Sequence, residues 1–232
     1  WIGGVQGNGG VPVEAILVTG DRVAARARLL WIRMNAPCVS DFEALKRVAR
    51  FLLGMPRLVQ IFQYQSLVKG FIGFSDTDHA GCLRTRKSTS GGALMHGVNN
   101  LQSYASTQSV IGTSSGESEF YGMVKMGSIL LGAKSMAEDL GVKARLVLKA
   151  DATAGIGMAK RRGVGKVRHL HTQTLWLQRK VLDGDIAVQK EAGTTNCSDL
   201  MTKHVSSDEM HRHLAKLGFE VRSGSSRLAL KA

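Results

Sequence analysis

The sequence has 232 residues, 44% of them hydrophobic, which is enough to bury the core of one good-sized domain with an appended segment. Lysines and arginines (31) outnumber aspartates and glutamates (18), and the net charge of +13 favours a polyanionic partner over a generic basic surface. The three cysteines are far apart and the apolar runs are short, which excludes a disulfide framework, a Cys-x-x-Cys zinc site and a membrane-spanning helix.

The N-terminal quarter predicts a loop followed by two helices. The glycine-rich residues 1–12 are typical of a flexible loop, and no basic patch precedes an apolar run there, so we expect an intracellular protein that is not secreted. The apolar, arginine-studded stretch 13–34 favours a helix. A second helix is predicted over 41–54, where Phe42, Leu45 and later apolar residues recur at helical spacing.

The next segments predict strands. Residues 58–65 and 69–76 are expected strands, and the second of them ends at Asp76. Residues 91–98 and 101–106 predict a hairpin, with Asn99 and Asn100 in its tight turn.

The rest of the chain alternates between helices and strands. A long helix is predicted over 115–140, with Glu117 and Glu119 in its first turn, where negative charge is favourable, and Gly141 just after its end. Further strands are expected at 145–151 and 185–191, and further helices at 152–161, at 168–184, from about 198, and at 206–218. This order predicts an α/β fold of the α+β kind, with a mixed sheet of about five strands flanked by helices.

Four acidic residues lie at the ends of predicted elements, and they are Asp76, Glu119, Asp151 and Asp199. Carboxylates at such ends can converge although they are far apart in the chain. Phosphodiester hydrolysis needs an activated water and a stabilised leaving oxygen, and two magnesium ions held by carboxylates supply both. The pattern therefore fits a metal-dependent nuclease, although ordinary helix-start acids would look the same.

Six sets of residues resemble motifs of the copia-type retrotransposon Pol polyprotein and follow that family's order. They are FSDTDHAG with RKSTSGG, SSGESEFYGMV, ADATAGIGMAK, KVRHLH, SDLMTKH and the upstream pair RMNAP and FEALKRVARFLLG. The upstream pair resembles the segment that links reverse transcriptase to ribonuclease H. The resemblance covers about residues 20–219, and it implies a ribonuclease H-like fold preceded by a helical connection segment.

The resemblance also implies a site and a reaction. The acid tetrad of ribonuclease H falls on Asp76, Glu119, Asp151 and Asp199. It would hold two Mg²⁺ ions, with Mn²⁺ as an alternative, for endonucleolytic hydrolysis of the RNA strand of an RNA–DNA hybrid. Asp76 would bridge both ions, Glu119 would support one and Asp199 the other, and Asp151 would lie close to the attacking water.

Domain boundaries and partners follow from the same resemblance. We expect residues 1–64 to be the end of reverse transcriptase and the connection segment, 65–222 to be the ribonuclease H-like domain, and 223–232 to be a flexible tail. The expected partners are an RNA–DNA hybrid and the reverse transcriptase domain of the same polyprotein, with no membrane. The expected location is the cytoplasm, a virus-like particle or the nucleus.

The sequence departs from the family's motifs at several positions. His79, Ala152 and His171 stand where the family has Trp, Asn and Asp, and Phe120 replaces a Tyr. No departure removes a tetrad carboxylate. The alternative function is a catalytically decayed domain that only binds hybrid or supports a reverse transcriptase. An unrelated DNA-binding protein lacks support, since no helix-turn-helix or zinc-finger string occurs.

Two basic segments are candidates for nucleic-acid binding. Arg84, Arg86 and Lys87 either contact phosphates or form a solvated loop. A denser cluster next to glycines favours phosphate contact, because a flexible loop can follow a nucleic-acid backbone. This cluster consists of Lys160, Arg161, Arg162, Lys166 and Arg168.

Two further acids lie beside the tetrad positions. Asp78 is more typical of a turn residue than of an outer metal partner. Glu117 is more typical of a favourable charge at a helix start than of a substitute for Glu119.

Overall fold

The computed structural model describes residues 11–13, 39–54, 57–82, 85–165, 167, 170 and 174–224. The helix expected over 13–34 and the expected flexible tail therefore lie almost wholly outside the described residues. A helix over Val39–Gly54 (α2) agrees with the prediction for 41–54. Its Phe42 and Leu45 are exposed, so this part of the predicted apolar stripe faces away from the described core.

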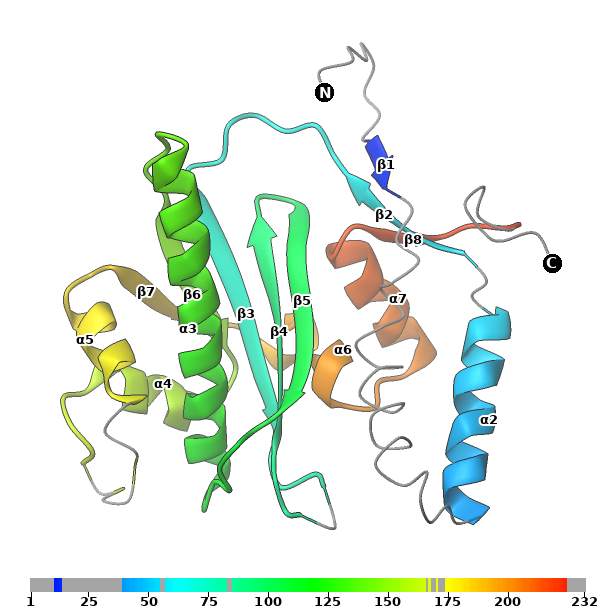
Figure 1. Ribbon diagram of the computed structural model, residues 1–232, viewed down its shortest axis with the longest axis horizontal. Coiled ribbons are helices and arrows are strands. Elements are labelled where there is room, and N and C mark those ends of the chain that lie inside the picture. Colours follow the sequence, from blue (N-terminus) through cyan, green and yellow to red (C-terminus); the bar gives the residue numbers. More distant parts are fainter. Residues whose placement is uncertain are drawn as a thin grey trace.

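A five-stranded mixed sheet forms the centre of the molecule, in the order β5-β4-β3-β6-β7 (Figure 1). The strands are β3 (Gly70–Asp78), β4 (Thr89–His96), β5 (Asn99–Thr107), β6 (Arg145–Ala150) and β7 (Ile186–Lys190). Neighbours β3, β4 and β5 are antiparallel, whereas β6 runs parallel to both β3 and β7. The expected fold class, a mixed sheet of about five strands flanked by helices, is confirmed.

Helices cover both faces of the sheet, and alternate residues of β3 show which helix covers which face. A Cβ on Gly73 would lie 2.5 Å from Met126 Sδ of α3 (Ser115–Asp139), so this face lies directly against that helix. The next residue, Phe74, packs in the opposite core with Leu200 and Leu217. Since successive side chains of a strand point to opposite faces, β3 is buried between two apolar cores.

The core on the α3 side also contains α4 (Thr153–Lys160) and α5 (Trp176–Leu182). The other core is formed with α6 (Asp199–Thr202) and α7 (Ser207–Lys216). Helix α3 begins at the N-cap Ser114, whose side chain accepts a hydrogen bond from Glu117 N. It is followed by Gly141 at φ +77°, as predicted for a helix end.

A second, three-stranded sheet lies beside the central one, and the sequence did not predict it in full. Strand β2 (Leu58–Phe62) pairs with β1 (Val11–Val13) and with β8 (Phe219–Val221), antiparallel to both. Residues 11 and 12 were predicted to be loop, and residues 219–221 had no predicted element. Both strands are only three residues long, too short to show a sequence period.

Two predicted boundaries are wrong for identifiable reasons. The hairpin turn lies at Gly97 and Val98, with Gly97 at φ +61°, and Asn99 belongs to β5. Asn99 is drawn into the strand because its side chain is buried against Gln63, where it exchanges two hydrogen bonds with the backbone. Strand β3 continues past Asp76 to Asp78, because it pairs with β4 as far as Thr89.

The helix predicted over 168–184 is shorter in the structure. It spans Trp176–Leu182, and residues 168, 169 and 171–173 lie outside the described part of the chain.

Candidate active site

Two of the predicted acids are brought together by the register of parallel strands. Ser75 of β3 lies opposite Ala150 of β6, so the residues that follow them lie side by side, Asp76 still within β3 and Asp151 just beyond the end of β6. Asp76 is fully buried on the central strand. Asp151 lies one residue beyond the end of its strand and remains partly exposed.

Glu119 reaches the same point from just after the first turn of α3, in which only Glu117 lies, although both acids were predicted there. The helix approaches the sheet closely there, because a Cβ on Gly122 would lie 2.5 Å from Thr77 Oγ1. Gly155 of α4 also allows a close approach, because a Cβ there would lie 3.0 Å from the Glu119 Cβ. As a result, carboxylate oxygens of Asp76, Glu119 and Asp151 lie within 4.8 Å of one another.

Asp199, the first residue of α6, joins this group through a lysine. Lys203 Nζ lies 3.2 Å from Asp199 Oδ1, 2.9 Å from Asp76 Oδ1 and 3.8 Å from Asp151 Oδ2. The structure thus gathers all four predicted acids at the carboxyl ends of β3 and β6, the lower end of the sheet in Figure 1. Three of them form the immediate cluster, and the fourth shares a cation with it.

The α6 segment also occupies both oxygens of Asp76. The Thr202 hydroxyl donates a hydrogen bond to Asp76 Oδ2, and the Lys203 ammonium donates one to Asp76 Oδ1. Helix α6 can lie this close to β4 because Gly91 has no side chain, and a Cβ there would lie 2.6 Å from the Met201 Cβ.

The electrostatics of the cluster follow from burial and from repulsion between like charges. Burial, followed by the charges of Asp76 and Asp151, raises the pKa of Glu119 to about 8. Burial and the charge of Asp76 raise the pKa of Asp199 to about 6, against the opposing effect of Lys203. Burial alone would lower the pKa of Lys203, but its hydrogen bond to Asp76 and the neighbouring carboxylates raise it above its ordinary value.

These residues fit a divalent cation. Glu119 Oε2 is buried and has no hydrogen-bond partner among the described residues. An unpaired buried carboxylate oxygen is costly, and a cation at the centre of the cluster would remove that cost. Carboxylate oxygens are also the ligands that Mg²⁺ and Mn²⁺ prefer. Asp76, Glu119 and Asp151 can therefore hold a metal ion.

A buried hydroxyl network supports the cluster and explains the string RKSTSGG. Ser88 Oγ accepts a hydrogen bond from Ala80 N and donates one to Ser118 Oγ, which also contacts the Nδ1 atom of His79. Gln108 Nε2 donates to Ser90 Oγ and to the Ser118 carbonyl. This network ties the start of α3, and hence Glu119, to the loop that follows β3.

Glu117 and Asp78, the two further acids that were not assigned to the tetrad, lie outside the cluster of carboxylates. Glu117 accepts hydrogen bonds from the Thr113 backbone and hydroxyl and from the Tyr121 hydroxyl, so its carboxylate holds the loop before α3. Asp78 lies over Gly81, where any Cβ would collide with its carboxylate. Burial and the charge of Asp76 raise the pKa of Asp78, so it lies at the edge of the same electrostatic field.

The predicted basic residues are only partly described. Arg84, Lys166 and Arg168 lie outside the described residues. Arg86 is exposed in the loop between β3 and β4, and Lys160 and Arg162 are exposed at the end of α4. Lys87 is half-buried. Arg161 folds back onto its own loop, where its guanidinium donates a hydrogen bond to the Val164 carbonyl and lies against Gly165.

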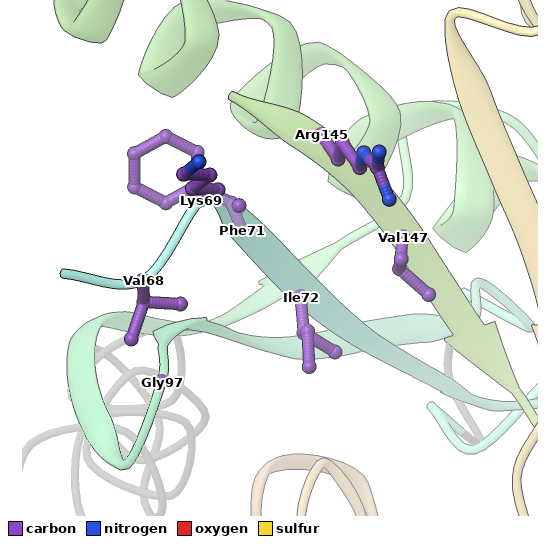
Figure 2. A pocket seen from close by; sticks show the side chains of 8 residues that line it. Val68, Lys69, Phe71, Ile72, Gly97, Arg145 and Val147 are labelled. Atoms are coloured by element: carbon purple, nitrogen blue, oxygen red, sulfur yellow. The ribbon is translucent and has the colours of Figure 1, made fainter. Parts of the chain in front are cut away.

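An apolar hollow of about 330 Å³ lies at the opposite end of the sheet (Figure 2). Its lining comes from the amino ends of β3 and β6 and from the β4–β5 turn, and it includes Phe71, Ile72, Arg145, Val147 and Gly97. The acids lie at the carboxyl ends of the same two strands, so the hollow is not part of the acidic site.

Sequence reasoning found the four acids but missed two residues that contact them. Thr202 and Lys203 belong to the string SDLMTKH, which carries part of the family resemblance but in which only Asp199 was predicted to have a role in the site. A sequence signal was present for their proximity to Asp199, since the threonine follows it by three residues and the lysine by four, although Lys203 itself lies just after α6.

No protein-family profile matches the chain. Among curated proteins, an uncharacterized mitochondrial protein of Arabidopsis thaliana, AtMg00810, is 29% identical over 108 residues, which are 47% of this chain and 45% of that protein. The retrovirus-related Pol polyprotein from transposon TNT 1-94 of Nicotiana tabacum is 23% identical over 174 residues, which are 74% of this chain and 13% of the polyprotein. Secreted RxLR effector protein 161 of Plasmopara viticola is 34% identical over 82 residues, 35% of this chain and 57% of that protein.

Among solved structures, LC11-RNase H1, isolated from compost by a metagenomic approach, aligns over 58% of this chain and 93% of its own, with 13% identity and a TM-score of 0.41.

The chain thus spans between about one eighth and somewhat over half of the length of these curated relatives. The match to the TNT 1-94 polyprotein confirms the resemblance to a retrotransposon Pol polyprotein that the sequence motifs indicated. No helix among the described residues is long and apolar enough to cross a membrane.

Proposed function

We propose that this chain is a ribonuclease H-type endonuclease that hydrolyses the RNA strand of an RNA–DNA hybrid as the end of a copia-type Pol polyprotein. The observation that carries the proposal is the convergence of Asp76, Glu119 and Asp151 within 4.8 Å, with Asp199 joined to them through Lys203. The motifs that contain these four acids are the ones that resemble the family. The net charge of +13, together with this acidic cluster, fits a site for a polyanion that works with cations.

Asp76, Glu119, Asp151 and Asp199 would hold two Mg²⁺ ions, with Mn²⁺ as an alternative. Such ions, when bound, supply an activated water and stabilise the leaving oxygen. Asp76 is the rigid centre of the site, because it is fully buried on the middle strand. The Asp151 side chain is 23% exposed and that of Asp199 14%, so Asp151 is the better placed of the two beside the attacking water.

Exposed and half-buried cations at the same end of the sheet would bind the phosphates of the hybrid. Arg86 and Lys87 lie in the loop that follows Asp76 and its strand. Lys160 is the last residue of α4, the helix that begins beside Asp151, and Arg162 lies just after it. Contacts of this kind give affinity and register without reading sequence. Upstream, residues 1–64 would be the end of the reverse transcriptase and its connection segment, the polymerase being a partner within one intracellular polyprotein.

One observation favours the alternative, a domain that binds hybrid without cutting it. Lys203 contacts three of the four acids, and a lysine that stayed there would keep Asp76 from binding a metal ion.

The experiment that decides is hydrolysis of a hybrid with labelled RNA by the full chain, in Mg²⁺, in Mn²⁺ and in EDTA. The nuclease should cut the RNA strand in either metal and not in EDTA, and it should leave double-stranded DNA of the same sequence intact. Hybrid binding without cleavage in both metals would establish the alternative. Cleavage that persists in EDTA would contradict the metal-dependent proposal.

A further inference from the structure

We propose that Lys203 is the resident counter-cation of the acidic cluster, and that its ammonium group must withdraw before a divalent cation can bind to Asp76. The inference rests on the proposed function, since it concerns the same cluster. It adds that metal binding in this protein is an exchange of one cation for another.

The first argument is position. The Lys203 ammonium lies within 4.0 Å of carboxylates from three separate segments, with distances of 2.9 Å to Asp76, 3.2 Å to Asp199 and 3.8 Å to Asp151. A point between three convergent carboxylates is where a hard cation would be held. Lys203 and a metal ion would therefore compete for the same oxygens.

The second argument is that both oxygens of Asp76 already have a partner, and one of these partners is a cation. Its Oδ1 accepts a hydrogen bond from Lys203 and its Oδ2 accepts one from Thr202. Each oxygen keeps a second lone pair, but a metal ion approaching Oδ1 would meet the positive charge of the Lys203 ammonium 2.9 Å away, so this contact must be released first. Glu119 is different, because its Oε2 has no hydrogen-bond partner in the described part of the chain.

The third argument is that Lys203 is able to leave. Its side chain is 42% exposed, whereas Asp76 is fully buried. The residue lies in extended backbone just after α6, at φ −115° and ψ 159°, so its rotation does not unwind the helix. A lysine ammonium is a compact, strongly hydrated charge on a flexible four-carbon stem, and it can move into water with little loss of packing.

Lys203 also has a stabilising role in the metal-free protein. Carboxylates crowded at one point repel one another in the absence of metal. Lys203 offsets part of that repulsion in the metal-free protein, and it holds Asp76 and Asp199 near the positions in which they would bind a cation. We therefore classify it as a positioning residue.

The test is metal binding by the full chain, without substrate. Mn²⁺ would be titrated into the parental protein and into the variants K203Q, K203R and K143Q, with bound Mn²⁺ measured by electron paramagnetic resonance. Lys143 is an exposed lysine in the loop before β6, at the opposite end of the sheet, so K143Q removes one charge far from the acids.

The variants should separate into two groups. If Lys203 occupies the site about nine-tenths of the time, K203Q should bind Mn²⁺ about tenfold more tightly than the parent. K203R keeps a cation in place and should stay near the parental affinity, as should K143Q. In EDTA the melting temperature of K203Q should fall below that of the parent, and saturating Mn²⁺ should remove the difference.

A second measurement uses the parental protein alone and so does not depend on how a variant folds. Amine labelling, read by mass spectrometry, should modify Lys203 slowly in EDTA and faster in saturating Mn²⁺, with Lys143 as the internal reference. Labelling of Lys203 that Mn²⁺ leaves unchanged, or a K203Q protein that binds Mn²⁺ no better than the parent, would overturn the inference but leave the proposed function standing. A parental protein that binds no Mn²⁺ at all would instead overturn the proposed function.

Discussion

The two ends of β3 and β6 differ in how their polar side chains are paired. At the amino ends, Asn99 exchanges hydrogen bonds of 2.8 and 3.0 Å with the Gln63 backbone. The side chain of Gln65 donates to the His96 carbonyl and accepts from Val98 N. These contacts join the segment before β3 to the β4–β5 hairpin, and they give both the oxygen and the nitrogen of the Asn99 and Gln65 side-chain amides a partner.

At the carboxyl ends, carboxylates crowd together with too few partners. Oxygens of Asp76, Glu119 and Asp151 lie within 4.8 Å, and the pKa of Glu119 is raised to about 8 by burial and by these neighbours. The two ends of the sheet therefore contribute differently to the stability of the fold. The amino end is arranged for stability, and the carboxyl end keeps an electrostatic cost that a bound cation would relieve.

The largest effect is expected from a substitution in the acidic cluster at the carboxyl ends of β3 and β6. Asp76→Asn preserves the shape of the central ligand but removes its negative charge, so Mn²⁺ binding should weaken and hybrid cleavage should fall by orders of magnitude. Binding of hybrid in EDTA should persist. The measurements are the rate of cleavage of labelled RNA and the affinity for uncut hybrid.

Asp78→Asn is the matched control for this substitution, because it makes the same chemical change two residues along the same strand. It should reduce the cleavage rate much less. An Asp76→Asn protein that cuts at the parental rate would show that Asp76 holds no metal ion.

The second prediction concerns the pH dependence of stability at the carboxyl end. The pKa of Glu119 is raised from 4.5 to about 8 in the folded protein, so between these values the folded state binds more protons than the unfolded state. The contribution of Glu119 is therefore present at low pH and is lost as pH rises through this window. Glu119→Gln should flatten the decline in the free energy of unfolding, measured by urea denaturation in EDTA.

Glu138→Gln provides the control for the pH experiment, since Glu138 is an exposed carboxylate at the other end of the same helix. Its pH profile should follow the parental one. A decline that stays equally steep in Glu119→Gln would mean that another group causes it.

The third prediction breaks the amino end instead. Asn99→Ala removes both hydrogen bonds to the Gln63 backbone and should lower the free energy of unfolding by about 1–2 kcal/mol. Cleavage per folded molecule should not change, because the acids lie at the far end of the sheet. Gln102→Ala, at an exposed position of the same strand, should stay within about 0.5 kcal/mol of the parent.

The smallest expected effect concerns the salt dependence of hybrid binding. It compares the exposed Lys160 and Arg162 with Arg161, whose side chain folds back onto its own loop. Hybrid affinity should fall steeply with salt, and neutralising Lys160 and Arg162 together should reduce the slope of log affinity against log salt by about two. Arg161→Gln should change it by less than one unit, since the Arg161 guanidinium bonds to the Val164 carbonyl. Fluorescence anisotropy over a range of KCl concentrations measures both slopes. Equal changes in slope would show that Arg161 turns toward the nucleic acid.

The acids of the candidate site, and most of the helices and strands that carry them, could be predicted from the sequence. Asp76, Asp151 and Glu119 lie next to strand ends or helix starts that periodicity and capping residues reveal, because those signals are local. The order of elements then sufficed for a mixed sheet of about five strands. The motif strings gave the family resemblance that the match to a Pol polyprotein confirmed.

Which polar residues contact those acids depends on how distant segments pack together in the folded protein. Lys203 and Asp76 are 127 residues apart, and no local period relates them. The residue type of Asn99 predicted a turn, but its side chain is buried and bonds to the backbone of Gln63, 36 residues earlier, and the residue belongs to β5. Strand β8 is three residues long and exists because β2 offers it an edge. In each case the deciding free energy comes from burying and pairing a group against a distant segment, which a sequence pattern read over neighbouring residues does not contain.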